Sequence, residues 1–218
     1  MSTILDTIGE YAKLRIREAK EKISPEEMKA RALAMDCNTG FPFEKALGKE
    51  EISFICECKK ASPSKGVIAE DFPYVQIARE YQQAGADCIS VLTEPKWFLG
   101  KNAYLKEITE SVSIPCIRKD FTVDDYMIYE AKTLGAAAVL LICALLDEER
   151  LKSYLTVCDR LGLSALVEAH DKEEIRRALR AGARIIGVNN RNLKDFTVDV
   201  ENSTRLRERV PDSVLFVA

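Results

Sequence analysis

Short apolar runs alternate with longer amphipathic stretches along most of this chain. Each run is rich in β-branched and other apolar residues, which is typical of buried strands. The runs cover residues 53–60, 88–94, 115–121, 137–143, 165–171, 185–190 and 214–218. The amphipathic stretches between them predict six connecting helices, and four of these stretches end at a glycine, which suits the left-handed position after a helix. Strands that alternate with helices predict parallel βαβ units.

The predicted strands are almost continuously apolar, so both faces of the sheet should be buried. An open doubly wound sheet and a closed barrel both have this property. Two features favour the barrel: no glycine-rich phosphate loop follows the first strand, and polar residues stand at the ends of many strands instead of at one switch point. We therefore expect the α/β class and a (β/α)8 TIM barrel over residues 51–218, with seven of its strands in this chain.

Residues 1–50 precede the first strand and have a helical pattern, which predicts an N-terminal helical extension. The apolar residues at near-helical spacing are Ile4, Ile8, Tyr11, Leu14 and Ala19. Ser24 followed by Pro25 and two glutamates predicts the start of a second helix, because serine caps a helix and proline suits its first turn. The segment Gly40–Pro42 is expected to end that helix.

Composition excludes several classes of function. The net charge is −3 and the charges are mixed along the chain, so nothing indicates a nucleic-acid partner. No apolar stretch reaches the roughly 20 residues that a membrane-spanning helix needs, and the N-terminus has no signal-peptide pattern. The seven cysteines lie mostly in apolar runs, so we expect them to be reduced and the protein to be cytoplasmic. Cys56 and Cys58 do not have a common zinc spacing, and the chain has one histidine, so we expect no metal site.

Ionisable groups recur at the ends of the predicted strands, where burial is costly unless the groups are paired or functional. Glu57 and Lys59 are two residues apart and therefore share a face of the first strand. Lys119 and Glu168 end two further strands. A ring of structural salt bridges would also explain such charges. Catalysis is the better interpretation of the set, because active sites of these barrels lie at the carboxyl ends of the strands.

Other residues near the strand ends have more than one interpretation. Asp120 should face away from Lys119 and form an ion pair, whereas His170 is expected to be a structural or rim residue. The segment Ser62–Gly66 alone would be an ordinary loop, but directly after Glu57 and its neighbours it is expected to contact an anion. Aromatic residues that follow two strands would either clamp a substrate ring or cap the barrel core: Trp97, Phe98 and Phe121.

Taken together, these residues resemble the indole-3-glycerol phosphate synthase family of tryptophan biosynthesis. The resemblance rests on five segments in order: Glu57–Gly66, Ser90–Phe98, Pro115–Phe121, Leu166–His170 and Gly187–Leu193. It implies a carboxy-lyase that closes the ring of 1-(2-carboxyphenylamino)-1-deoxyribulose 5-phosphate and releases CO₂ and water to give indole-3-glycerol phosphate. The implied partner is this phosphorylated, anthranilate-derived small molecule, and the implied reaction uses neither a metal nor an organic cofactor. The resemblance is also compatible with fusion to, or association with, other tryptophan-pathway enzymes.

The resemblance further implies a role for each site residue. Lys119 would be the general acid at the substrate carbonyl, and Glu168 would be the base for dehydration. Lys59 would be a second acid or a clamp for the carboxylate, and Glu57 would orient a lysine or assist proton transfer. The residues expected to bind substrate are Asn189, Arg191, Ser62, Phe98 and Phe121.

Family members continue past the seventh strand with a Glu-Ser-Gly motif and a glycine-containing loop, and the last two loops of such barrels usually hold phosphate. Since the chain stops at Ala218, we expect it to be incomplete, to bind substrate weakly and to expose strand edges that favour aggregation. An inactive barrel fragment or assembly piece is therefore the alternative function. A second enzyme candidate, phosphoribosylanthranilate isomerase, would need a cysteine–aspartate pair, but Cys58 alternates away from Glu57 and no aspartate replaces Glu168.

Overall fold

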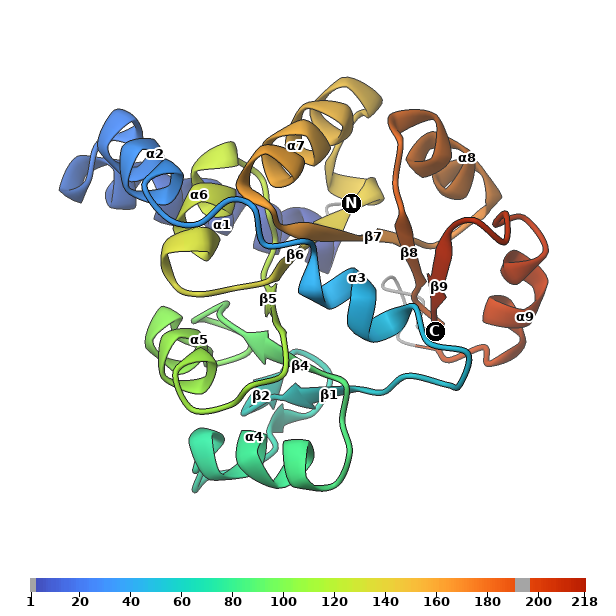
Figure 1. Cartoon of the computed structure of the whole chain (residues 1–218), viewed down its shortest axis with the longest axis horizontal. Coiled ribbons are helices and arrows are strands. Elements are labelled where there is room, and N and C mark those ends of the chain that lie inside the picture. The colour runs from blue at the N-terminus through green and yellow to red at the C-terminus, as the bar shows by residue number, and fades with distance from the viewer. Residues whose placement is uncertain (1–2, 191–196) are drawn as a thin grey trace.

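A seven-stranded parallel sheet curls through the molecule, with its strands in chain order (Figure 1). The computed structural model describes residues 3–190 and 197–218. The strands of this sheet are β1 (Ile55–Cys58), β4 (Cys88–Leu92), β5 (Cys116–Lys119), β6 (Ala138–Ile142), β7 (Ser164–Ala169), β8 (Ile185–Val188) and β9 (Leu215–Val217). Each strand pairs in parallel with the next one along the chain. All seven predicted strands are therefore confirmed.

Helices on the outside of the curled sheet connect successive strands, as the amphipathic stretches predict (Figure 1). They are α4 (Tyr74–Gln83), α5 (Asn102–Thr109), α6 (Asp125–Thr133), α7 (Glu148–Leu161), α8 (Lys172–Ala181) and α9 (Glu201–Arg207), with a short 3-10 helix, η1 (Cys143–Leu145), before α7. The glycines predicted to follow four of these helices all have positive φ: Gly85, Gly135, Gly162 and Gly182. Among the described residues, no helix has the length and apolar character required to cross a membrane.

The strands β1 and β9 form the two edges of this sheet in the part of the chain that the structure describes. A cavity of about 860 Å³ lies between them and is lined by residues of both, including Ile55 and Val217. The α/β class and the curled parallel sheet agree with a TIM-barrel-like fold. The curled sheet encloses the barrel interior on most sides, and it is open between its two edge strands, β1 and β9.

Side chains of the sheet alternate between an interior and an outer layer, as the period of a strand requires. The interior cluster contains Leu5, Phe43, Cys88, Ile117, Ala138, Leu140, Ile142, Leu166 and Ile185. The intervening residues, among them Ile89, Val139 and Val167, pack outward in the cluster that also contains buried residues of the covering helices. Both faces of the sheet are therefore buried, in agreement with the almost continuous apolar runs.

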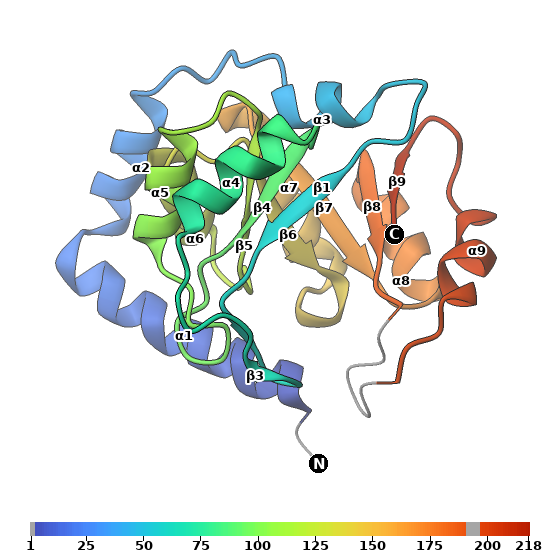
Figure 2. The same ribbon diagram turned by 90° about the horizontal axis from the view of Figure 1, so that it is seen from below.

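Three helices precede the sheet, and two of them, α1 and α3, lie at its two ends (Figure 2). The long helix α1 (Ile4–Lys22) lies at the end where the strands finish, and α3 (Pro42–Leu47) lies at the opposite end, with α2 (Pro25–Leu33) between them in the chain. Phe43 of α3 is completely buried in the interior cluster. The helical extension therefore covers the interior from both ends.

Two details of the extension differ from the sequence prediction. The buried residues of α1 are Leu5, Ile8, Gly9, Ala12 and Ile16, whereas Leu14 is 43% exposed. The predicted apolar stripe is therefore wrong at Leu14, whereas Ile8 is buried and Ile4, Tyr11 and Ala19 are partly buried. The buried positions Gly9 and Ala12 were not predicted, because hydrophobicity alone does not indicate the close packing that small residues allow. The second helix starts at its Ser24 cap as predicted, but it ends at Leu33, well before the segment Gly40–Pro42.

That segment starts a helix instead of ending one. Pro42 occupies the first turn of α3, where a proline needs no backbone hydrogen-bond donor, and Phe41 before it has a left-handed φ of 55°. The loop after the first strand also has structure that the sequence did not predict. It forms a two-stranded antiparallel hairpin of β2 (Ala61–Ser62) and β3 (Gly66–Val67), with a turn at Pro63–Lys65.

Candidate active site

A cavity of about 390 Å³ opens at the end of the sheet where the strands finish. Its polar lining comes from strand ends and the β2–β3 hairpin, and α1 supplies an apolar wall of Ile4, Leu5 and Ile8. The predicted site residues in this lining are Glu57, Lys59, Ser62, Phe98, Lys119, Phe121 and Asn189. A smaller adjoining cavity contains Lys119, Phe121 and Asn189 again and adds Glu168. The structure therefore brings together every predicted site residue that it describes.

Glu57 is at the centre of a cluster of charges in this cavity. Its Oε1 accepts a hydrogen bond of 2.6 Å from Lys59 Nζ, and Lys119 Nζ lies 3.6 Å from its Oε2. Ser90 of the neighbouring strand, which is in register with Glu57, donates its hydroxyl to Oε2 at 3.2 Å. The three charged side chains remain 28–35% exposed, so a ligand can reach them.

The surroundings of Glu57 keep it ionised. Burial raises the pKa of this carboxyl, but the positive charges of Lys119 and Lys59, with hydrogen bonds from Lys59 and Ser90, outweigh burial and lower the pKa below its usual value of 4.5. One carboxylate thus lies between two ammonium groups at neutral pH. The sequence identified the charged residues, but it did not identify Ser90 as their partner.

Glu168 ends β7 on the other side of the cavity. Its side chain is 14% exposed, and Asn189 Nδ2 donates to its Oε1 at 3.4 Å. Glu168 is in register with Gly187 of β8, where a larger side chain would meet Leu166. Arg191, the remaining predicted substrate-binding residue, lies outside the described residues.

Two of the three aromatic residues that follow the strands face the cavity. The rings of Phe98 and Phe121 are 6.0 Å apart, and both line it. Trp97 instead packs edge-on against Tyr11 of α1, with ring centroids 5.4 Å apart. Trp97 therefore attaches the loop after β4 to the N-terminal helix, and the Phe98–Phe121 pair is the candidate ring clamp.

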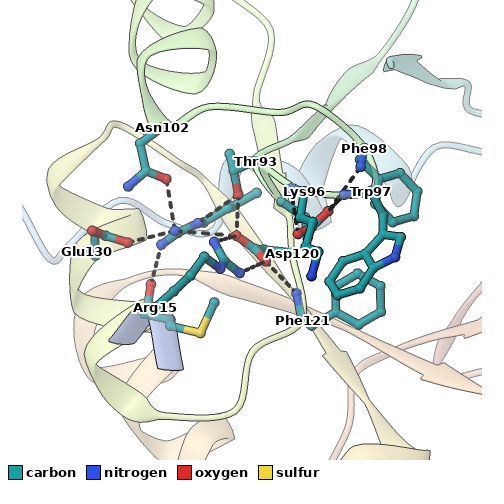
Figure 3. A network of polar contacts seen from close by, with 12 residues as sticks. Arg15, Thr93, Lys96, Trp97, Phe98, Asn102, Asp120, Phe121 and Glu130 are labelled. Carbon is teal, nitrogen blue, oxygen red and sulfur yellow. Dashed lines mark hydrogen bonds and ion pairs between the residues drawn. The ribbon is translucent and has the colours of Figure 1, made fainter. Parts of the chain in front are cut away.

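The loop that carries Phe98 is held by Glu94, a completely buried residue. The Glu94 carboxylate accepts three backbone hydrogen bonds, from the amides of Lys96, Trp97 and Phe98, at 2.7–3.0 Å. Figure 3 labels these three donor residues. Such bonds to a carboxylate are among the stronger ones in proteins. Glu94 therefore has a structural role in shaping the loop and explains one of the charges at the strand ends.

The side chain of Asp120 lies in a buried polar network (Figure 3). Arg15 of α1 donates to both of its oxygens, at 3.2 and 2.7 Å, and Thr93 donates at 2.7 Å. Asp120 also accepts the backbone amide of Phe121 at 2.8 Å. The ion pair predicted for Asp120 is confirmed, but its partner on the N-terminal helix was not predicted.

Arg118 extends this network toward the outer helices. Its guanidinium contacts Glu130 of α6 at 2.6 Å, Asn102 of α5 at 2.9 Å and Asp120 at 3.6 Å, and its side chain is 3% exposed (Figure 3). Burial raises the pKa of Asp120, but Arg15 and Arg118 outweigh burial and lower the pKa below 3.8. Two arginines therefore hold a fully buried carboxylate directly beside Lys119.

The cysteines do not take part in this site. All seven are free, and Cys58 is buried on the outer face of β1, where burial raises its pKa to about 12. The acid role that an isomerase would require of Cys58 is therefore not supported. Within the described residues, no group of three or more histidine, cysteine, aspartate or glutamate side chains is placed to hold a metal ion.

The curled parallel sheet and a cavity of acid–base groups at its carboxyl end define a TIM-barrel-like enzyme. The family model described as Indole-3-glycerol phosphate synthase matches residues 5–218. The chain belongs to this family and is a carboxy-lyase. The alternative of an inactive assembly piece is not favoured.

Individual relatives agree with this assignment. The Indole-3-glycerol phosphate synthase of Ruminiclostridium cellulolyticum is 55% identical over 215 residues, which cover 99% of this chain and 83% of the relative. That of Endomicrobium trichonymphae is 54% identical with the same coverage. A crystal structure of the YdjI aldolase from Escherichia coli K12 matches with a TM-score of 0.55 and 16% identity, covering 84% of this chain and 71% of the aldolase. The aldolase shares the fold only.

Proposed function

We propose that this chain converts 1-(2-carboxyphenylamino)-1-deoxyribulose 5-phosphate into indole-3-glycerol phosphate, CO₂ and water, the reaction of its family in tryptophan biosynthesis. One observation carries the proposal: Lys59 and Lys119 flank Glu57 in a cavity, and Lys119 also lines the adjoining cavity that contains Glu168. Two cationic acids and two carboxylates at the end of a curled parallel sheet suit a sequence of proton transfers. The proposal requires neither a metal nor an organic cofactor.

Lys119 is the general acid of ring closure in this proposal. A carbon of the substrate's aromatic ring attacks the ketone carbon, and the ketone oxygen takes a proton from Lys119 Nζ. Loss of CO₂ then returns its bonding electron pair to the ring, which restores aromaticity. The contact of Lys119 with Glu57 aligns the ammonium group for this transfer.

Glu168 is the base of the dehydration step, and Lys59 is its acid. Glu168 removes a proton from the carbon beside the ring nitrogen, and Lys59 protonates the departing hydroxyl, so that water leaves and the second ring double bond forms. Glu57 orients both lysines through the contacts to its two oxygens. A positioned acid or base of this kind accounts for about 10²–10⁴-fold in rate.

The substrate-binding residues are Asn189, Arg191, Ser62, Phe98 and Phe121. The two phenylalanines enclose the aromatic ring, and Ser62 contacts an anionic group of the substrate from the β2–β3 hairpin. Arginine matches a carboxylate with paired hydrogen bonds, which suits Arg191 to the substrate carboxylate.

The proposal also covers the architecture and the compartment. Residues 1–50 are the N-terminal extension of a (β/α)8 barrel whose strands begin after residue 51, and one further strand between β1 and β9 would close the sheet. Seven free cysteines suit a reducing compartment, so the enzyme works in the cytoplasm. Association with other enzymes of the pathway is compatible with this assignment.

Replacement of Lys119 tests the proposal. Lys119→Ala should lower kcat at least about a hundredfold while the unfolding transition is unchanged, because the general acid is lost and an exposed ammonium is not needed for folding. Indole fluorescence measures product, and urea unfolding measures stability. The control is Lys106→Ala on the exposed face of α5, which should retain wild-type kcat. Near-normal turnover of Lys119→Ala would show that another group is the acid.

Replacement of Glu168 separates the two halves of the reaction. In a single turnover, Glu168→Gln should release CO₂ but form indole at least about a hundredfold more slowly, because only dehydration requires the base. Timed assays of CO₂ and of indole fluorescence on the same samples distinguish the steps. If indole forms at the wild-type rate, Glu168 is not the base.

A further inference from the structure

The chain's single histidine lies directly behind Glu168. His170 follows β7, and its Nε2 is 3.4 Å from Glu168 Oε1, while its Nδ1 is 3.1 Å from Glu174 Oε2 of α8. The imidazole therefore stands between two carboxylates. Its side chain is 22% exposed, so it is not a freely solvated residue at the rim. It is not a fully hydrogen-bonded structural histidine either, because Nε2 makes no hydrogen bond within the described chain.

Glu174 fixes the orientation of this ring. The Oε2 atom of Glu174 accepts a hydrogen bond of 2.7 Å from the backbone amide of His170, and the same oxygen contacts His170 Nδ1. Glu174 belongs to the first turn of α8, whose amides are capped by Asp171, and Arg177 lies 3.7 Å from its other oxygen. The carboxylate is held by its helix and by Arg177, so it sets both the position and the protonation of His170 Nδ1.

This arrangement favours the doubly protonated ring. An ionised carboxylate can only accept hydrogen bonds, so the contact with Glu174 requires a proton on His170 Nδ1. In a neutral imidazole Nε2 would then be an unprotonated acceptor that faces the carboxylate of Glu168. Nε2 is enclosed and makes no hydrogen bond within the described chain. Only the charged ring places an N–H toward Glu168, where the two groups attract.

Three carboxylates around His170 act in the same direction: Glu168 at the end of β7, and Asp171 and Glu174 at the start of α8. The cation Arg177, one turn further along α8, has the opposite sign and pairs with Glu174. From η1, the Cys143 thiol donates to the backbone carbonyl of Glu174 at 3.7 Å. Burial lowers the pKa of His170, but the hydrogen bond to Glu174 and the charges of Glu168, Glu174 and Asp171 raise it above 6.5.

We propose that His170, aligned by Glu174, is a positioning residue for Glu168 that directs this carboxylate into the cavity. The inference rests on the proposed role of Glu168 as the base. A base removes a proton efficiently only from a defined position, and the imidazole 3.4 Å behind Glu168 restricts the orientations of this carboxylate. Glu174 neutralises the imidazolium from the other side, so the charged pair can be buried.

The charge state of His170 can be measured without activity, because one imidazole in the chain gives unambiguous NMR signals. In the wild-type chain its pKa should lie above 6.5. Glu168→Gln and Glu174→Gln should each lower it. The matched control is Glu173→Gln, which removes a charge from the same helical turn but from a residue that contacts Arg176. A pKa that does not respond to Glu168→Gln would overturn the proposal.

The pH dependence of turnover tests the effect on catalysis. His170→Asn should lower kcat about tenfold at neutral pH, because Glu168 loses the group that fixes its orientation, with KM within about twofold. Wild-type kcat should show a fall as pH rises through the measured pKa of His170, and this step should be absent in His170→Asn. Glu174→Gln should retain the step but move it to lower pH.

The outcomes separate this inference from the proposed function. If Glu168→Gln forms indole normally, the base is another residue and the inference fails with it. If Glu168→Gln blocks dehydration while His170→Asn retains the wild-type kcat and pH profile, only the inference is overturned. Should His170→Asn fail to fold, Glu174→Gln decides: an unshifted step in its pH profile would refute the role of His170.

Discussion

Arg15 of the first helix binds both carboxylate oxygens of Asp120, which lies 105 residues further along the chain. Asp120 is fully buried and follows Lys119, the proposed general acid, at the end of β5 (Figure 3). It also accepts the backbone amide of Phe121, a residue that lines the cavity. The ion pair therefore joins the N-terminal helix to a segment that carries two side chains of the site.

Loss of this contact should destabilise the protein. We expect Arg15→Ala to lower the free energy of unfolding by about 3 kcal/mol, because it leaves the buried Asp120 carboxylate with one fewer counter-charge. Urea unfolding at neutral pH measures the change. Lys13→Ala on the same helix breaks an exposed contact with Glu10 and should cost less than about 1 kcal/mol. Equal midpoints for Arg15→Ala and Lys13→Ala would contradict a stabilising ion pair.

The effect of Arg15 should depend on pH in a defined direction. The pKa of Asp120 is lowered below 3.8 in the folded state, so its ionised form stabilises the fold above that pH and the contribution is lost as pH falls through the folded pKa. The difference in unfolding free energy between the wild type and Arg15→Ala should therefore be constant near neutrality and shrink in acid. Urea unfolding over a series of pH values checks this. A difference that grows below pH 3.8 would exclude the ion pair as its source.

Glu94 should control the shape of the loop that carries Phe98. Glu94→Gln replaces an acceptor of three backbone hydrogen bonds with a side chain that presents a donor at one position, at an expected cost of about 2 kcal/mol. KM should rise, since Phe98 lines the cavity, whereas Glu107→Gln, at an exposed partner of Tyr74, should leave KM unchanged. Urea unfolding and steady-state kinetics measure the two effects. An unchanged KM would mean that the loop does not position Phe98 for substrate.

Glu57 should matter more for turnover than for stability. Glu57→Gln removes the negative charge between Lys59 and Lys119, so both ammonium groups lose their common partner. We expect kcat to fall about 10–100-fold, less than the loss of a direct acid or base of up to about 10⁴-fold. Glu80→Gln on α4, whose carboxylate accepts a hydrogen bond from Gln76, is the control. A variant as active as this control would place Glu57 outside the proton-transfer machinery.

The sequence predicted the strands more accurately than the first helix. Seven apolar runs bounded by helices correspond to seven paired strands, because burial on both faces imposes a pattern that few other structures share. The predicted apolar stripe of α1 included Leu14, which is exposed, and it omitted Gly9 and Ala12, which are buried. Small residues allow close approach of two elements, and their burial depends on what lies opposite.

The sequence predicted which residues form the site, and it predicted some of the contacts between them. The alternation of side chains along a strand was sufficient to place Glu57 and Lys59 together, and to direct Asp120 away from Lys119. It could not identify Ser90 as the donor to Glu57, because that contact depends on the register between two strands. Nor could it connect His170 to Glu174, which a helical turn brings back toward the strand end.

The sequence by itself determined the alternation of strands and helices, and it determined which residues stand at strand ends, since both follow from periods of two and 3.6 residues along the chain. Only the tertiary structure decided which charges meet. Curvature of the sheet brings Glu168 to the cavity of Lys119, and the N-terminal helix contributes Leu5 to the cavity wall and Arg15 to the support of Asp120. These contacts join residues far apart in the chain, so they depend on packing that no local pattern encodes.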